Sequence, residues 1–346
     1  MKLVRLLSVF LLIVSFLTNA SAQTPVDQDD VIRVDTDLTN LLFTAVDKQG
    51  RFIITLREED LRLSEDGVPQ KILTFQRETD RPLSLAFLID VSASEERTLP
   101  LEKAAARSFI ETVIQSSRDQ VAIVPFTGSA FLEQGLTRDV LSIYRALERV
   151  EVALPTYLGS GRALTGIASG PGMKATPPEG TTAIWDAIAL TASDVLARGV
   201  SQRRRAIILL TDGQDTTSRL SRKDAINRAL DAETVIYAIG IGDSKYEGIN
   251  HDGLKAVATA TGGRAFFPKR EADLKAAFAE IEAELRSQYL IAYSSSNKKR
   301  DGAYRQMRLE VVNPELEKAK LKLRYRPGYF AKPVTSPKPV TSPKPN

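Results

Sequence analysis

Oxygen-bearing side chains follow an apolar segment of the sequence at a spacing that suits a metal ion. Asp90 comes directly after the continuous apolar run 83–89, and Ser92 and Ser94 stand two and four positions further on. A run of this kind is typical of a central strand in a parallel sheet that is covered on both faces. On a loop that leaves the strand, alternate side chains can converge on one point. We therefore expect these three side chains to share a site at the carboxyl end of a strand.

A second aspartate and a threonine extend this oxygen cluster. Asp212 follows another continuous apolar run, 206–211, and Thr182 follows a Gly-Thr pair. Mg²⁺ prefers six oxygen ligands in octahedral geometry and usually keeps some of its waters. Two carboxylates supply negative charge, three hydroxyls supply neutral oxygens, and at least one coordination position stays open. The sequence thus predicts a site for Mg²⁺, with Mn²⁺ or Ca²⁺ as alternatives.

The order of these motifs resembles the metal-ion-dependent adhesion site of von Willebrand factor type A domains. That family has Asp-x-Ser-x-Ser after its first strand, a threonine in a later loop and Asp-Gly after its fourth strand. The resemblance covers roughly residues 82–286 and implies an α/β fold with a doubly wound, mostly parallel six-stranded sheet. It implies a non-enzymatic module that binds a protein partner, with an acidic side chain of the partner able to fill the sixth metal position. The metal ligands that it implies are Asp90, Ser92, Ser94, Thr182 and Asp212.

Two features depart from the family pattern. Glu95 and Glu96 stand where many relatives carry an apolar or small residue, and their carboxylates either add a ligand or repel an acidic partner. The segment 155–180 is long, rich in Gly, Pro and Ser, and leads straight to the predicted metal threonine. We expect it to form a variable loop beside the site, so the identity of the partner does not follow from the resemblance.

Catalysis is the main alternative to binding. A Mg²⁺-dependent phosphatase could use Asp90 as its nucleophile, although Ser92 stands where such enzymes usually carry a carboxylate for acid/base work. The single histidine, His251, lies in a segment that is typical of a helix cap, which disfavours a Ser-His-Asp hydrolase and zinc hydrolases. A scaffold whose metal site is vestigial is the remaining alternative. We expect no enzymatic activity.

The N-terminal end of the chain predicts export, and the C-terminal end predicts a tail without regular structure. Residues 1–22 have a basic start, an apolar stretch and an Ala-x-Ala cleavage sequence, as a signal peptide does. The apolar stretch is short for an uncleaved membrane anchor. We therefore expect a secreted or periplasmic protein with no transmembrane segment after cleavage. Residues 331–346 repeat Lys-Pro-Val-Thr-Ser-Pro, which predicts an unstructured Pro/Lys-rich tail.

Charge and cysteine content exclude further classes. Without Lys2, Arg5 and the three lysines of the tail, the net charge falls from +4 to −1, so the body of the protein offers nucleic acid no basic surface. The densest basic run, 203–205, is interpreted as a solvated start of a strand and not as a binding patch. With no cysteine, the fold has no disulfide and depends on its core.

The remaining segments predict a second, β-rich part of the protein. Strand patterns occupy 31–36, 41–46, 61–64 and 71–75 before the α/β segment and 288–293, 304–312 and 319–325 after it. The turn at 65–67 predicts a hairpin that pairs 61–64 with 71–75. Neither half has enough strands for a stable domain. We expect residues 23–81 and 288–330 to form one small β-sandwich, into which the α/β domain 82–287 is inserted. Two separate β pieces that pack on the α/β core are the alternative. Helices are expected over 99–116, 138–150, 182–197, 221–232, 252–260 and 271–286.

Overall fold

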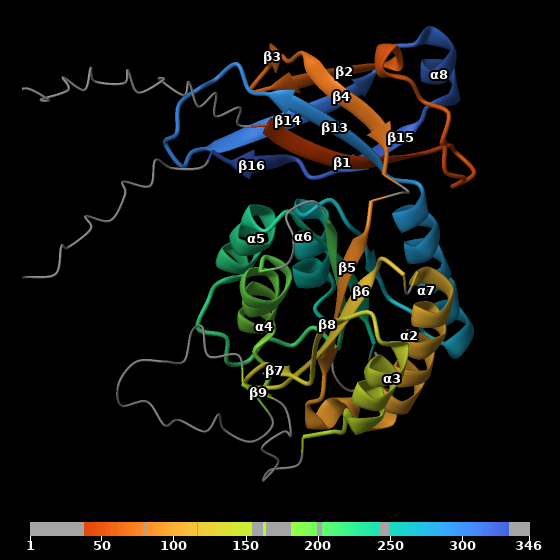
Figure 1. Cartoon of the computed structure of the whole chain (residues 1–346), viewed down its shortest axis with the longest axis vertical. Coiled ribbons are helices and arrows are strands. Elements are labelled where there is room, and N and C mark those ends of the chain that lie inside the picture. Colours follow the sequence, from red (N-terminus) through yellow and green to blue (C-terminus); the bar gives the residue numbers. More distant parts are fainter. Residues whose placement is uncertain are drawn as a thin grey trace, which may run out of the picture. The chain divides into compact units, whose positions relative to one another are not determined.

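A computed structural model describes residues 38–78, 81–115, 117–153, 162–163, 181–198, 203–241 and 249–331 (Figure 1). The predicted signal peptide, the predicted strand at 31–36, nearly all of the predicted loop 155–180 and tail residues 332–346 lie outside this part. The predicted domain boundaries therefore stay predictions. Within the described residues, no helix is both long and apolar enough to cross a membrane.

A six-stranded sheet forms the centre of the α/β part, in the order β12-β11-β10-β5-β6-β8. Five of its strands are parallel, and β8 runs antiparallel to β6 at one edge. All eight residues of β5 are buried, as the continuous apolar run predicts. The strands are β5 (Leu83–Asp90), β6 (Gln120–Phe126), β8 (Gln134–Thr137), β10 (Arg204–Thr211), β11 (Thr234–Gly240) and β12 (Ala265–Phe266). The predicted doubly wound α/β fold is confirmed.

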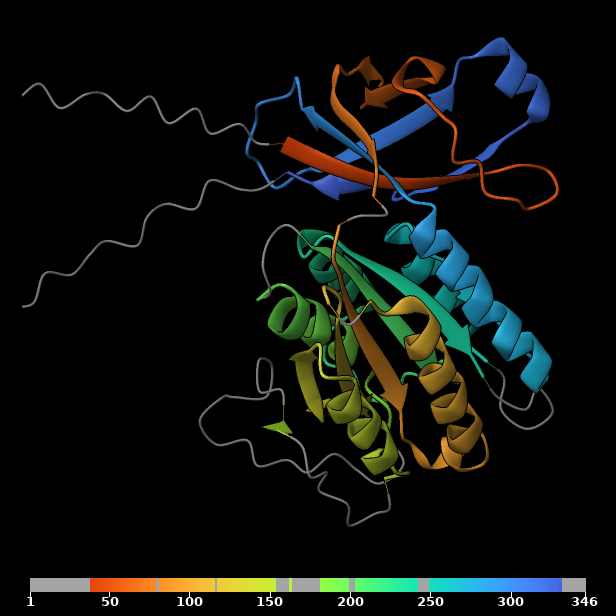
Figure 2. The same ribbon diagram turned by 45° about the vertical axis from the view of Figure 1, so that its right-hand side comes forward.

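Helices cover both faces of this sheet (Figure 2). Successive residues of a strand point to opposite faces, and Phe87 and Leu88 accordingly belong to two separate cores. The ring of Phe87 lies 6.0 Å from that of Phe109 on α2 and 6.5 Å from that of Phe278 on α7. One face packs α2 (Leu99–Val113), α3 (Val140–Arg149) and α7 (Glu271–Arg286), and the other packs α4 (Ile184–Leu190), α5 (Arg222–Asp231) and α6 (His251–Ala260). A π-helical turn, η3 (Thr191–Leu196), continues α4.

The strands of the β-rich part form two antiparallel sheets that share one apolar core. Each sheet combines strands that precede the α/β part with strands that follow it, which confirms the predicted β-sandwich. The first sheet has the order β15-β1-β13-β4, with β15 (Lys322–Tyr325), β1 (Leu38–Val46), β13 (Tyr289–Ser294) and β4 (Ile72–Arg77). The second has the order β16-β14-β2-β3, with β16 (Gly328–Phe330), β14 (Tyr304–Val311), β2 (Leu61–Glu65) and β3 (Val68–Pro69). Short elements complete the described part: η1 (Glu58–Asp60), η2 (Ala93–Arg97), α8 (Pro314–Ala319), and the paired strands β7 (Phe131–Leu132) and β9 (Arg162–Ala163).

Two local predictions in the β-rich part are wrong. The predicted hairpin joins β2 to the two-residue strand β3, whereas β4 pairs with β13 in the other sheet. Asp66 and Gly67 have φ angles of 49° and 80°, so the chain reverses at once and leaves only a short return strand. The strand expected from 319 starts at Lys322 instead. Asn313 caps α8 through its side chain, Pro314 occupies the first turn, and Lys320 ends the helix in a left-handed conformation.

The prediction of a solvated basic run at 203–205 is also wrong. Arg203 and Arg204 are only 9% and 8% exposed. Arg203 donates hydrogen bonds to the hydroxyl of Ser84 and to the carbonyl oxygen of Leu83, both at 2.8 Å, and Arg204 donates to the carbonyl oxygen of Leu285. The guanidinium groups thus pair with backbone carbonyls near the amino ends of the strands. These carbonyl oxygens replace the water that the buried guanidinium groups have lost. The sequence pattern could not show these partners.

Candidate metal centre

Asp90 is the last residue of β5, and its carboxylate is fully buried. Its Oδ2 accepts a hydrogen bond from the hydroxyl of Thr211 at 2.6 Å, and its Oδ1 accepts one from the backbone N–H of Ser92 at 3.0 Å. Thr211 can reach Asp90 because β5 and β10 are neighbouring parallel strands that end at the same edge of the sheet. The two hydrogen bonds fix the orientation of the carboxylate.

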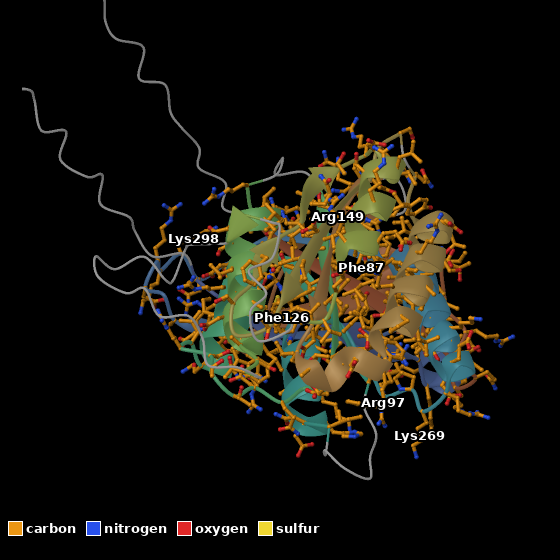
Figure 3. All side chains as sticks on the ribbon, turned by 90° about the horizontal axis from the view of Figure 1, so that it is seen from below. Phe87, Arg97, Phe126, Arg149, Lys269 and Lys298 are labelled. Carbon is orange, nitrogen blue, oxygen red and sulfur yellow. The ribbon has the colours of Figure 1, made fainter. Side chains whose placement is uncertain are left out.

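The two serines lie where the chain turns from β5 into η2. Ser92 is buried, Ser94 is exposed, and their hydroxyl oxygens are 3.0 Å apart. In the view from this end of the sheet, Arg97 of η2 lies toward the rim, whereas Phe87 lies further in (Figure 3). Ser92 thus contacts Asp90 through its N–H, and its hydroxyl lies beside that of Ser94.

Asp212 follows the last residue of β10 and is 6% exposed. Its Oδ1 accepts a hydrogen bond from the backbone N–H of Gln214 at 2.9 Å. Gly213 has a φ of +84°, a conformation that side chains rarely adopt, which explains a glycine at this turn. One carboxylate oxygen of Asp212 lies within 4.8 Å of an oxygen of Asp90. The structure therefore brings these two predicted ligands together.

Thr182 is tied by its backbone to the loop that contains Asp212. Its N–H donates to the hydroxyl of Thr216 at 2.8 Å, and its carbonyl oxygen accepts from the N–H groups of Thr216 and Thr217 at 2.9 and 3.1 Å. The threonine is 4% exposed. All five residues predicted to hold the metal therefore lie in segments that meet at the carboxyl edge of the sheet.

Two glutamates add to the acidic cluster at this edge. Glu95, on η2, is 1% exposed, and one of its oxygens lies within 4.8 Å of oxygens of both Asp90 and Asp212. Glu102, in the first turn of α2, is fully buried beside it. Glu102 was not among the residues predicted from the sequence. It stands three and four positions before Ala105 and Ala106 on the buried stripe of the helix, and that spacing could have indicated its burial.

Burial shifts the protonation of these acids. Burial raises the pKa of Asp90 to about 6 and that of Glu95 to about 10, and the charge of Glu102 adds to the shift of Glu95. Burial likewise raises the pKa of Glu102 to about 7. Within the described part of the chain, no Lys or Arg forms a salt bridge with these three residues or with Asp212. Ionised carboxylates without a counter-charge are costly to bury, so the cluster favours a bound cation.

The geometry of the donors fits such an ion. Oxygens that bind Ca²⁺ lie about 2.3–2.6 Å from it and those that bind Mg²⁺ about 2.0–2.1 Å, so ligand oxygens on one ion lie within about 5 Å of one another. The oxygens of Asp90, Glu95 and Asp212, which lie within 4.8 Å of one another, satisfy the limit for Ca²⁺, whereas direct ligands of Mg²⁺ lie within about 4.2 Å. Carboxylates and hydroxyls are the ligands of a hard divalent cation, and the site contains no nitrogen or sulfur ligand among the described residues.

A sequence model of the von Willebrand factor type A domain matches residues 84–280. The chain belongs to this family. Domains of the family generally mediate protein–protein interaction or adhesion, and their metal site implies a divalent ion. The predicted family membership is therefore confirmed. No curated protein sequence matches the chain.

Solved structures of similar fold include several von Willebrand factor type A proteins. Proximal thread matrix protein 1 from the mussel byssus is 20% identical, with a TM-score of 0.48, and the match covers 64% of this chain and 51% of that one. The chain thus spans about half the length of that protein, which has also been solved with a zinc-occupied metal-ion-dependent adhesion site. A von Willebrand factor type A protein from Catenulispora acidiphila is 15% identical, with a TM-score of 0.46, and the match covers 87% of this chain and 75% of that one.

Proposed function

We propose that this protein is a non-enzymatic binding module that captures a protein partner through a divalent cation. The observation that supports this function is the buried acidic cluster at the carboxyl edge of the sheet, which has no salt-bridge partner among the described residues. Mg²⁺ is the proposed ion, with Mn²⁺ and Ca²⁺ as alternatives. The proposed ligands are Asp90, Ser92, Ser94, Thr182 and Asp212.

The two aspartates among the proposed ligands are oriented by hydrogen bonds. Thr211 and the backbone of Ser92 orient Asp90, and the backbone of Gln214 orients Asp212. A bound cation would offer a partner's oxygen atom a positively charged coordination position. The chain's own side chains would neutralise the rest of the ion's charge and fix its place. A rigid site of this kind binds with little loss of conformational entropy.

We also propose that the protein acts outside the cytoplasm, secreted or in the periplasm. The support is the signal-peptide pattern of residues 1–22. The N-terminal sequence of the protein recovered from its natural source should begin near Gln23. Material that still carries Met1 would contradict export by cleavage.

Asp90→Ala tests the proposed function. We expect this variant to lose Mg²⁺ binding in calorimetry and to lose Mg²⁺-dependent capture of partner protein, with a circular dichroism spectrum close to that of the wild type. Glu96→Ala is the matched control, because Glu96 is exposed in the same turn and should keep both properties. A chelator should abolish capture by the wild type.

Two outcomes would overturn the proposal. Capture that persists in chelator and in Asp90→Ala would identify a scaffold whose metal site is vestigial. Turnover of a phosphate ester by the wild type, lost in the same variant, would identify a phosphatase with Asp90 as its nucleophile.

A further inference from the structure

Three buried carboxylate oxygens of the acidic cluster have no hydrogen-bond partner, namely both oxygens of Glu102 and one oxygen of Glu95. Glu95 has two side-chain oxygens, and the hydroxyl of Thr98 donates to Oε2. Its Oε1 is buried and receives no hydrogen bond, although the residue is only 1% exposed. Buried polar oxygens are nearly always paired. Oε1 of Glu95 therefore requires a partner, and no hydrogen bond among the described residues provides one.

The position of Glu95 indicates what that partner is. A carboxylate oxygen of Glu95 lies within 4.8 Å of oxygens of both Asp90 and Asp212, so the three acids surround one point. Three nearby donors already have acceptors elsewhere: the hydroxyl of Thr98 donates to the other oxygen of Glu95, and the hydroxyl of Thr211 and the N–H of Ser92 donate to Asp90. Oxygen atoms of three carboxylates at this separation match the ligand sphere of a hard cation.

We infer that Glu95 is a further ligand of the cation, so that three carboxylates and not two surround the ion, while some of the hydroxyl groups act through water and leave a coordination position for a partner. This inference rests on the proposed metal site. It also defines the chemistry of the partner. A divalent ion among three carboxylates carries a net charge of about −1, which repels a further carboxylate. The group that the site accepts from a partner is therefore a neutral oxygen, such as an amide or a hydroxyl, and not an acidic side chain.

The turn that holds Glu95 keeps the side chain inside the site. The N–H of Glu95 donates to the carbonyl oxygen of Ser92 at 3.0 Å, and the N–H of Thr98 donates to the carbonyl oxygen of Glu95 at 3.1 Å. Glu96, the next residue of the same turn, points its side chain to solvent. The two neighbouring residues therefore place one carboxyl group inside the site and the next one in solvent.

Binding of Mn²⁺, measured by calorimetry, tests the inference in four proteins. We expect Asp90→Asn to lose binding, Glu95→Gln to bind at least tenfold more weakly than the wild type, and Glu96→Gln to stay within about threefold of it. Wild-type affinity in Glu95→Gln, with binding lost in Asp90→Asn, would overturn the role of Glu95 and leave the proposed function intact. Failure of the wild type to bind any divalent ion would overturn both.

The number of waters on the bound ion gives a second readout. Glu95 occupies a coordination position that Gln binds weakly, so Glu95→Gln should gain about one water on Mn²⁺, measured by water proton relaxation. Addition of acetate should displace that water in Glu95→Gln and leave the wild type unchanged. An equal response of the wild type to acetate would contradict the exclusion of acidic partners. If Glu95→Gln does not fold, Glu95→Asp serves instead, because its shortened side chain keeps the charge and should also gain a water.

Discussion

Replacement of Asp212 by Asn should stabilise the protein in the absence of metal. The carboxylates of Asp90 and Asp212 approach within 4.8 Å. At an effective dielectric constant near 20, two ionised groups at that distance repel each other by about 3.5 kcal/mol. Asn removes this repulsion, and its side-chain oxygen can still accept the hydrogen bond from the N–H of Gln214. We expect the free energy of unfolding in chelator at pH 7.5 to rise by about 1–3 kcal/mol, measured by urea denaturation.

A divalent cation should offset this difference in stability. A ligand present at one hundred times its dissociation constant stabilises the folded state by about 2.7 kcal/mol. The wild type should gain that amount in saturating Mg²⁺, whereas Asp212→Asn, which has lost a charged ligand, should gain little. Glu96→Gln, at an exposed position, should behave as the wild type in both conditions. The reasoning is refuted if Asp212→Asn is less stable than the wild type in chelator, or if both proteins gain equally from the metal.

Two further predictions concern single side chains. Thr211→Val removes the hydroxyl that donates to Asp90 and accepts from the N–H of Gly213, so it should lower the free energy of unfolding by about 1–3 kcal/mol in urea denaturation and weaken Mn²⁺ binding. Thr211→Ser should keep the stability and the Mn²⁺ affinity of the wild type. Equal losses in the two variants would contradict a role of the hydroxyl. Burial raises the pKa of Tyr237 and Tyr293 above the ordinary value of 10, so only the unfolded state releases their protons just above that pH. The free energy of unfolding should therefore be insensitive to these two groups below pH 10 and fall above it by about 1.4 kcal/mol per pH unit for each tyrosine. Ionisation of these two tyrosines in the folded protein, seen as absorbance at 295 nm before unfolding begins, would contradict this prediction.

The sequence predicts the α/β part well because its strands are buried on both faces. Continuous apolar runs such as 83–89 are typical of buried central strands in a parallel sheet. The end of each run indicates which side chain lies at the edge of the sheet. The helices predicted over 271–286 and 221–232 match α7 and α5 to within a residue at each end. Asp90 and Asp212 could be placed together for this reason, without any knowledge of distances.

The prediction fails where a residue's partners lie far away in the sequence. Nothing local shows that β4 pairs with β13, because the turn at Asp66 looks like the centre of a longer hairpin. The burial of Arg204 depends on the carbonyl oxygen of Leu285, which only the folded chain brings near. Glu102 was missed for another reason: its spacing to Ala105 and Ala106 indicates burial, but a glutamate in the first turn of a helix usually faces solvent and interacts favourably with the helix dipole.

The hydroxyl of Thr211 shows how the fold and the proposed site depend on each other. This one group donates to Asp90 at the end of β5 and accepts from the N–H of Gly213, which fixes the turn that carries Asp212. Two strands in adjacent positions and one hydroxyl between them therefore set the separation of two carboxylates. The same arrangement forces like charges together in a buried place, which opposes folding unless protons or a cation neutralise them. The repulsion between the two buried carboxylates thus opposes folding of the site. In the proposed function, a divalent ion would remove this repulsion at the position where a partner would bind.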